Sequence, residues 1–327
     1  MPSSHLRLRP LLRLPAKCVF PMSAPAPTAP KEELFDAEFL DRLRALFLRL
    51  RKRKQLRRKG LQNTPATGFT REFKDFRHYT PKDDFRAIDW RLYARLDRLF
   101  IRLYEEIQEF HVHIVIDTSA SMVEPFPEKR LTSLKLAVAL AYMGLVGHHR
   151  VSLHGIGSSL TPPPPPMKGQ GSLQRVLDFA RDLEYGGLTD LERCFQDFQP
   201  GKQRYGIIFV ISDLYGRDVD EAREAIRHAS AWPGEIHFIQ VFHPWEEKPD
   251  VEGEIELYDV ETQEYRRLWF TPGDRERYEK RFGQFLDDIE KTCQARQIDY
   301  QRWRTDCPFD ELFLDLLSRG SALAGNS

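Results

Sequence analysis

The stretch from His111 to Met122 reads HVHIVIDTSASM, and it holds the clearest fold signal in the chain. Apolar and β-branched side chains run into an aspartate, and small hydroxyl residues follow it. A second stretch of this kind, YGIIFVISD, runs from Tyr205 to Asp213. Strands that are apolar on both faces are typical of the centre of a parallel sheet. The two stretches therefore predict buried strands that each lead into a polar loop.

Outward from these stretches, the pattern alternates between strands and helices. We expect further strands at 99–104, 151–156, 236–242 and 299–304, an edge hairpin within 254–270, and helices at 133–148, 173–183, 191–198, 219–231, 275–296 and 309–319. Such alternation favours an α/β fold, because crossover helices join parallel strands and cover both faces of their sheet. The prediction is a doubly wound, mostly parallel sheet with a small N-terminal extension.

The sequence divides into three expected segments. The first thirty residues contain no acid and many prolines, so residues 1–32 are expected to be a disordered leader, with Met22 as an alternative start. The prolines would break the amphipathic helix of a transit peptide. Residues 33–104 are expected to hold a basic amphipathic helix and a polar-aromatic extension, and residues 105–327 the α/β domain.

Charge and cysteine content limit the partners and the compartment. Lys+Arg and Asp+Glu both number 49, so the net charge favours no partner. The four cysteines (Cys18, Cys194, Cys293 and Cys307) form no CxxC motif. We therefore expect neither a disulfide framework nor a cysteine zinc site, and a cytoplasmic location. No apolar run reaches the roughly 18 residues of a transmembrane helix.

The basic segment 42–59 contains no acid and has a leucine stripe. Its simplest interpretation is a solvated helix docked by its leucines. A peripheral contact with a membrane surface or an acidic partner is the alternative. Nucleic acid is not expected, because the segment lacks interleaved aromatic residues and a nucleic-acid-binding fold.

Hard oxygen donors follow the two buried strands. These are Asp117, Ser119 and Ser121 after the first strand, Asp213 after the second, and Thr189 in a loop between them. In open α/β sheets, ligands bind at the carboxyl ends of the strands. Hydroxyl and carboxylate oxygens suit Mg²⁺, or else Mn²⁺ or Ca²⁺. The alternative is that these residues only cap the helices that follow them.

The series Asp117-x-Ser119-x-Ser121, Thr189 and Asp213 resembles the metal-ion-dependent adhesion site of von Willebrand factor A domains. The resemblance implies a von Willebrand A or Rossmann-like fold. It also implies a non-enzymatic interaction module in which a divalent cation captures an acidic group of a protein partner. No small-molecule substrate is expected.

A second resemblance lies upstream, in the stretches Glu72-Phe73, Arg77-x-Tyr79, Pro81 to Asp84 and Ile88-Asp89-Trp90. They resemble the signature of the bacterial family called domain of unknown function fifty-eight. Both resemblances together span about residues 68–213. The family implies a MoxR-type AAA+ ATPase as partner, in chaperone or complex-maturation work. One departure is Lys82, where the family has glycine.

The charged residues within this signature have two interpretations. One is a structural ion-pair network, with Trp90 and Tyr93 packing the extension onto the α/β domain. The other is a docking surface.

Two further functions remain open at this point. A phosphohydrolase of the haloacid dehalogenase type also has an aspartate after its first strand, but it needs a second aspartate where this chain has Ser119. A metal-free scaffold is the other alternative. A nucleophile elbow and a P-loop are both missing from the sequence.

Overall fold

The computed structural model describes residues 19–20, 35, 38–46, 71–81, 83–106, 110–187, 189–200, 206–216, 219–258 and 265–319. The chain forms two compact units. The larger unit comprises residues 1–56 and 110–326, and the smaller comprises residues 57–109.

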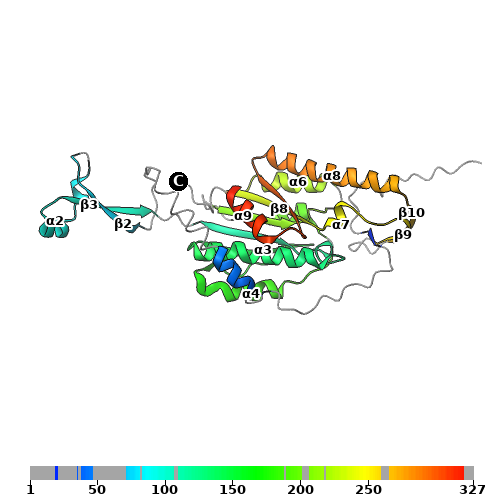
Figure 1. Ribbon diagram of the computed structural model, residues 1–327, viewed down its shortest axis with the longest axis horizontal. Helices are drawn as coiled ribbons and strands as arrows, with labels where there is room; N and C mark the ends of the chain where they lie inside the picture. Colours follow the sequence, from blue (N-terminus) through cyan, green and yellow to red (C-terminus); the bar gives the residue numbers. More distant parts are fainter. Residues whose placement is uncertain are drawn as a thin grey trace, which may run out of the picture. The chain divides into compact units, whose positions relative to one another are not determined.

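A six-stranded sheet forms the centre of the larger unit (Figure 1). In spatial order its strands are β11 (Asp299–Arg304), β8 (Glu235–Phe242), β7 (Gly206–Ser212), β4 (His111–Asp117), β5 (Arg150–Ile156) and β6 (Met167–Lys168). All neighbours pair in parallel except β6, which pairs antiparallel with β5. If the six strands are numbered 1 to 6 in chain order, their spatial order read from the β6 edge is 3-2-1-4-5-6. This order reverses direction between β4 and β7. That reversal is where doubly wound folds bind ligands.

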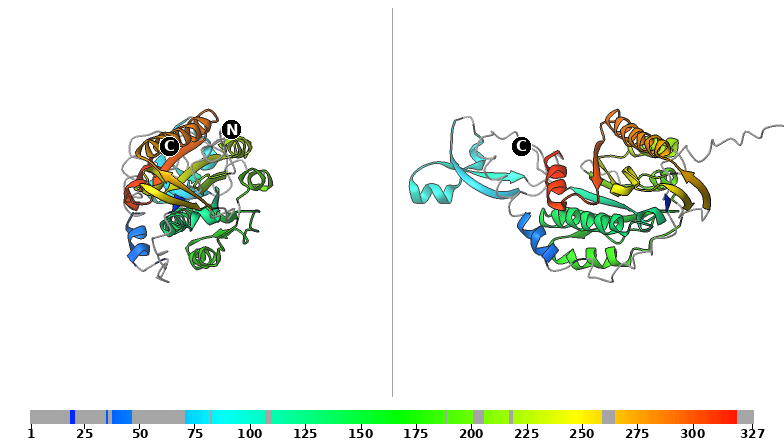
Figure 2. Two further views of the ribbon diagram at one scale, coloured as in Figure 1. Left: turned by 90° about the vertical axis from the view of Figure 1, so that its right-hand side faces the viewer. Right: turned by 45° about the vertical axis from the view of Figure 1, so that its right-hand side comes forward.

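Helices cover both faces of this sheet (Figures 1 and 2). They are α3 (Pro127–Val146), α4 (Leu173–Asp182), α5 (Leu191–Asp197), α6 (Val219–Ala229), α7 (Pro244–Glu247), α8 (Pro272–Gln294) and α9 (Phe309–Arg319). Alternate residues of one strand enter two cores: Ile114 packs with α3, α4 and α9, whereas Val115 packs with α5, α6 and α8. The α/β class and the alternation of elements are confirmed.

The N-terminal segments differ in part from expectation. Val19–Phe20 forms β1, which pairs antiparallel with β9 (Gly253–Tyr258) of the predicted hairpin, so this short part of the expected leader is a strand. The partner strand of β9 is β10 (Tyr265–Phe270). The rest of 1–32 lies outside the described residues.

The predicted basic helix is seen only over residues 38–46. Leu43 and Leu46 are buried in the core beneath α3, as the leucine stripe predicted. This helix therefore belongs to the larger unit, whereas we expected it to group with the extension. Residues 47–70 lie outside the described residues. Within the part of the chain that the structure describes, no helix combines the length and apolar character needed to cross a membrane.

The smaller unit is an antiparallel hairpin with short helices between its strands. The elements are β2 (Arg71–His78), η1 (Phe85–Ala87), α2 (Trp90–Leu96) and β3 (Phe100–Glu106). Among the described charged residues of the signature, two aspartates cap helices and one forms an ion pair, and the choice between an ion-pair network and a docking surface stays a prediction. Asp84 caps η1 and Asp89 caps α2, because their carboxylates accept backbone N–H bonds. Arg77 pairs with Asp83 at 2.6 Å. Packing of the unit onto the α/β domain stays a prediction, and Lys82 lies outside the described residues.

Candidate metal site

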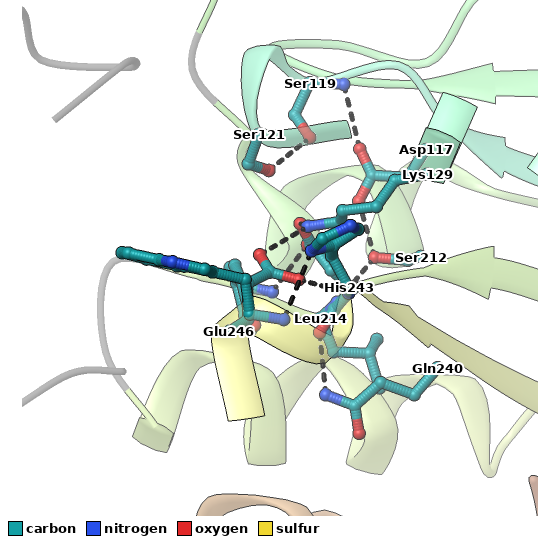
Figure 3. A network of polar contacts seen from close by, with 12 residues as sticks. Asp117, Ser119, Ser121, Lys129, Ser212, Leu214, Gln240, His243 and Glu246 are labelled. Atoms are coloured by element: carbon teal, nitrogen blue, oxygen red, sulfur yellow. Dashed lines mark hydrogen bonds and ion pairs between the residues drawn. The ribbon is translucent and has the colours of Figure 1, made fainter. Parts of the chain in front are cut away.

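The first loop of the predicted site begins at the last residue of β4. One carboxylate oxygen of Asp117, Oδ1, accepts the backbone N–H of Ser119 at 2.9 Å. The hydroxyls of Ser119 and Ser121 lie 3.0 Å apart. The other carboxylate oxygen, Oδ2, accepts the hydroxyl of Ser212 at 2.5 Å. Figure 3 shows the serine pair on one side of Asp117 and Ser212 on the other.

The second loop follows β7, the neighbour of β4. Asp213 is fixed by two contacts: its Oδ1 accepts the N–H of Tyr215 at 3.0 Å, and its backbone carbonyl accepts the amide of Gln240 at 2.7 Å. The parallel register places the ends of β4 and β7 side by side. The charge of Asp213 acts on Asp117, because the two carboxylates share this edge of the sheet.

The third loop carries Thr189 and is bonded directly to the first. The N–H of Gly186 donates to the carbonyl of Thr118 at 2.9 Å, and the N–H of Ala120 donates to the carbonyl of Gly187 at 3.3 Å. Thr189 is buried. The structure thus brings all three predicted loops together at the reversal point of the sheet.

Helix capping does not account for these residues. Ser119 precedes the short helix η2 (Ala120–Met122), but its side chain makes no capping hydrogen bond. At α5 the cap is Asp190, which accepts the N–H of Arg193 at 3.0 Å. Asp190, and not Thr189, is therefore the N-cap of α5.

Lys129, in the first turn of α3, is a residue that the sequence did not single out. Its side chain is 0% exposed. The ammonium Nζ donates to Oδ2 of Asp213 at 2.7 Å and to Oε1 of Glu246 in α7 at 2.9 Å. The other oxygen of Glu246 accepts the N–H of His243 at 2.6 Å. The lysine joins three separated parts of the chain inside the protein (Figure 3).

Burial is electrostatically costly for the cluster of charged side chains formed by Asp117, Asp213, Glu246 and Lys129. Burial, with the charge of Asp213 as the second cause, raises the pKa of Asp117 to about 7. Burial also raises the pKa of Glu246, although the nearby Lys129 opposes that rise. Lys129 contacts two of the three buried carboxylates, and the third, Asp117, is close enough to Asp213 to feel its charge. With all four groups ionised, their net charge would be −2. Charge of this kind is unfavourable in an interior unless a cation compensates it.

The donor set fits a hard divalent cation. Ser119 and Ser121 present paired hydroxyls, and Asp117 supplies a carboxylate beside them. Oxygen donors of this kind suit Mg²⁺ and Mn²⁺. Asp213 differs from the others, because its Oδ2 is already held by Lys129. It fits the role of an outer carboxylate.

Comparisons with known proteins place the chain among relatives whose function is not characterised. Residues 75–284 match the family model described as protein of unknown function DUF58. The uncharacterized protein Rv1480 of Mycobacterium tuberculosis is 26% identical over 236 residues, which is 70% of this chain and 73% of that protein. An uncharacterized protein of Mycobacterium bovis matches equally.

Two solved structures show distant similarity. BatB from Bacteroides thetaiotaomicron has a TM-score of 0.34 at 14% identity, covering 66% of this chain and 98% of that one. The VWA domain of SpRpn10 has a TM-score of 0.33 at 12% identity, covering 67% and 100%. The fold class rests on the strand order of the sheet itself. The match to the family model spans well over half of the 327 residues of this chain, so the chain belongs to the DUF58 family of proteins of unknown function.

Proposed function

We propose that this protein is a metal-dependent protein-binding module, in which the loops around Asp117 hold a divalent cation that takes a carboxylate from a partner. The observation that carries the proposal is the burial of three carboxylates, Asp117, Asp213 and Glu246, with the single ammonium of Lys129, which leaves a surplus of two negative charges when all four groups are ionised. A dication would neutralise that surplus, whereas a single proton on Asp117 would remove only half of it. When bound, the cation supplies an electrophilic centre for the partner's carboxylate oxygen.

The roles of the chain's own residues follow from their contacts. Ser119 and Ser121 would hold the cation through their hydroxyls, and Asp117 would balance its charge. Thr189 would contribute a further hydroxyl from the adjoining loop. Lys129 would keep Asp213 oriented, because it fixes one of the two carboxylate oxygens of Asp213. With few charged groups directly on the ion, the ion retains affinity for an external carboxylate.

Access to the site requires a local movement. The five predicted ligands are at most 3% exposed. The loop that carries Thr189 contains Gly186 and Gly187 at φ values of 144° and 74°. Glycine adopts such conformations at little cost. A small shift of this loop, which breaks its bonds to Thr118 and Ala120, would open the site to a partner.

We propose a MoxR-type AAA+ ATPase as the partner, in chaperone or complex-maturation work, on the basis of the family resemblance. The test is to immobilise the full chain and measure binding of a co-encoded ATPase in Mg²⁺ and in EDTA. Binding should be stronger in Mg²⁺ and should weaken in Ser121→Ala. The matched control is Ser230→Ala, an exposed residue directly after α6, which should bind as wild type does.

Two outcomes would contradict this assignment. Equal binding in Mg²⁺, in EDTA and in Ser121→Ala would favour the metal-free scaffold, because the partner would then use another surface. No binding under any of these conditions would remove the ATPase as the partner.

A further inference from the structure

A second group of metal-ligating side chains lies at the opposite edge of the sheet, where the parallel strands begin. Glu235 is the first residue of β8, and His237 lies two residues later on the same face. Asp299 is the first residue of β11 and is the register partner of His237. Within the described ranges, their ligand atoms form a group of His, Cys, Asp and Glu atoms that all lie within 4.8 Å of one another.

Both ring nitrogens of His237 face carboxylates. Nε2 lies 3.1 Å from Oε1 of Glu235, and Nδ1 lies 3.3 Å from Oδ2 of Asp299. A neutral imidazole donates from one nitrogen and presents a lone pair at the other. That lone pair would meet a carboxylate oxygen, which is a repulsive contact. A metal ion bound at Nε2 beside Glu235 would replace this repulsion, while Nδ1–H donates to Asp299.

The geometry of the histidine is fixed before any ion arrives. The ring stacks on Phe209 with centroids 4.8 Å apart and planes inclined by 19°. His237 is only 4% exposed, whereas the side chains of Glu235 and Asp299 are 26% and 53% exposed. His237 and Asp299 also line a small surface hollow together with Leu316 of α9. An ion could thus enter from solvent, meet a preset imidazole and keep water in its remaining positions.

We infer that Glu235, His237 and Asp299 form a second cation site, one that takes a borderline transition metal such as Zn²⁺. An imidazole nitrogen and a carboxylate oxygen suit such ions, and a carboxylate on the other ring nitrogen is the usual outer partner of a metal-bound histidine, while Mg²⁺ is usually held by oxygen alone. The ion would sit at the start of β8, and Asp299 at the start of β11, the strand that pairs with β8, would orient the imidazole from its other side. This site is independent of the Asp117 site, which lies at the carboxyl edge.

The test is calorimetric titration of Zn²⁺ into the full chain, with excess Mg²⁺ present to occupy oxygen-only sites. The informative variant is Asp299→Asn, because a half-exposed side chain tolerates this change without loss of the fold. Glu235→Gln is the second variant. The matched control is Asp287→Asn, an exposed carboxylate that pairs with Arg302 and lies outside the group.

We expect one equivalent of Zn²⁺ to bind to wild type, to Asp287→Asn and to Asp117→Asn. Binding should weaken by at least about tenfold in Glu235→Gln, which loses a direct ligand, and in Asp299→Asn, which loses the outer partner of the imidazole, since loss of an outer partner alone costs roughly 10–100-fold. Equal Zn²⁺ affinity in Asp299→Asn and in the control would overturn the site. Absence of Zn²⁺ binding to wild type would also overturn it.

Discussion

The ammonium of Lys129 lies 2.7 Å from a carboxylate oxygen of Asp213, and both side chains are sealed from solvent. Lys129 contacts Glu246 as well, at 2.9 Å. Isolated buried charges are costly, so the contacts of Lys129 with the two carboxylates stabilise all three groups in the interior. The lysine therefore holds the loop after β7 and the helix after β8 against the start of α3.

Replacing Lys129 should destabilise the protein strongly. Lys129→Met keeps the length of the side chain but leaves two buried carboxylates without their cation. Removal of one partner of a buried pair costs about 3–5 kcal/mol. Urea unfolding in EDTA should show a loss of this size.

The control for this variant is an exposed ion pair. Arg227 pairs with Glu224 at 2.6 Å on the surface of α6, with both side chains about half exposed. Arg227→Met should cost at most about 1 kcal/mol, because solvent screens such pairs. If both variants lost the same stability, the buried lysine would have no special role.

Two buried histidines should make the fold sensitive to acid. Nδ1 of His113 lies 3.3 Å from Nε2 of His154. Burial is the main cause that lowers the pKa of His113 to about 3 and that of His154 to about 4. Below pH 6.5 the two histidines bind protons in the unfolded chain but stay neutral in the folded chain. The free energy of unfolding should therefore fall as the pH drops from 6.5 towards 4.

The expected slope is on the order of 1.4 kcal/mol per pH unit for each histidine. His154→Leu should reduce the slope by about one histidine's share, measured by chemical unfolding from pH 4.5 to 7.5. An unchanged slope in this variant would mean that His154 is protonated equally in both states.

Much of the candidate site follows from the sequence, for a clear reason. Buried parallel strands are recognisable as β-branched runs, and their carboxyl ends must share one edge of the sheet. Asp117 and Asp213 could therefore be placed together without coordinates. Lys129 and Glu246 could not, because a charged residue in the first turn of a helix usually faces water, and the two are 117 positions apart.

The smaller unit shows a different limit. The helix α2 was not predicted from the sequence, because its residues lack the apolar stripe that indicates an amphipathic helix. Its Trp90 is exposed, and arginines occupy other positions. A usable signal was present in Asp89, which caps the helix by accepting the N–H groups of Arg91 and Leu92. The group around His237 depended on the register between β8 and β11, which a sequence does not reveal.

Gly234, just before β8, should tolerate no side chain. It has φ of 127°, and a Cβ there would lie 2.3 Å from the carbonyl oxygen of Gly206. Gly234→Ala should cost more than about 2 kcal/mol through clash and backbone strain. Gly283 in α8 is the matched control, because open space surrounds it. Gly283→Ala should stabilise the protein by about 0.5–1 kcal/mol. The measurement is the denaturant midpoint of unfolding, and midpoints that shift equally in both variants would contradict the predicted difference between the two glycines.

Phosphohydrolase activity should be missing. The position two residues after Asp117 is Ser119, and a serine cannot serve as the general acid that protonates a leaving group. A panel of phosphate esters with Mg²⁺ should give no turnover above the Asp117→Asn background. Turnover that depends on Asp117 would reverse the assignment in favour of an enzyme.

The most direct test of the account is calorimetric titration of Mg²⁺, and separately Mn²⁺, into wild type, Asp117→Asn and the surface control Asp287→Asn. We expect one equivalent to bind to wild type and to the control. We also expect that heat to be lost in Asp117→Asn, which has one buried carboxylate fewer at the site. The same heats in all three proteins, or no heat in wild type, would contradict a cation at this site.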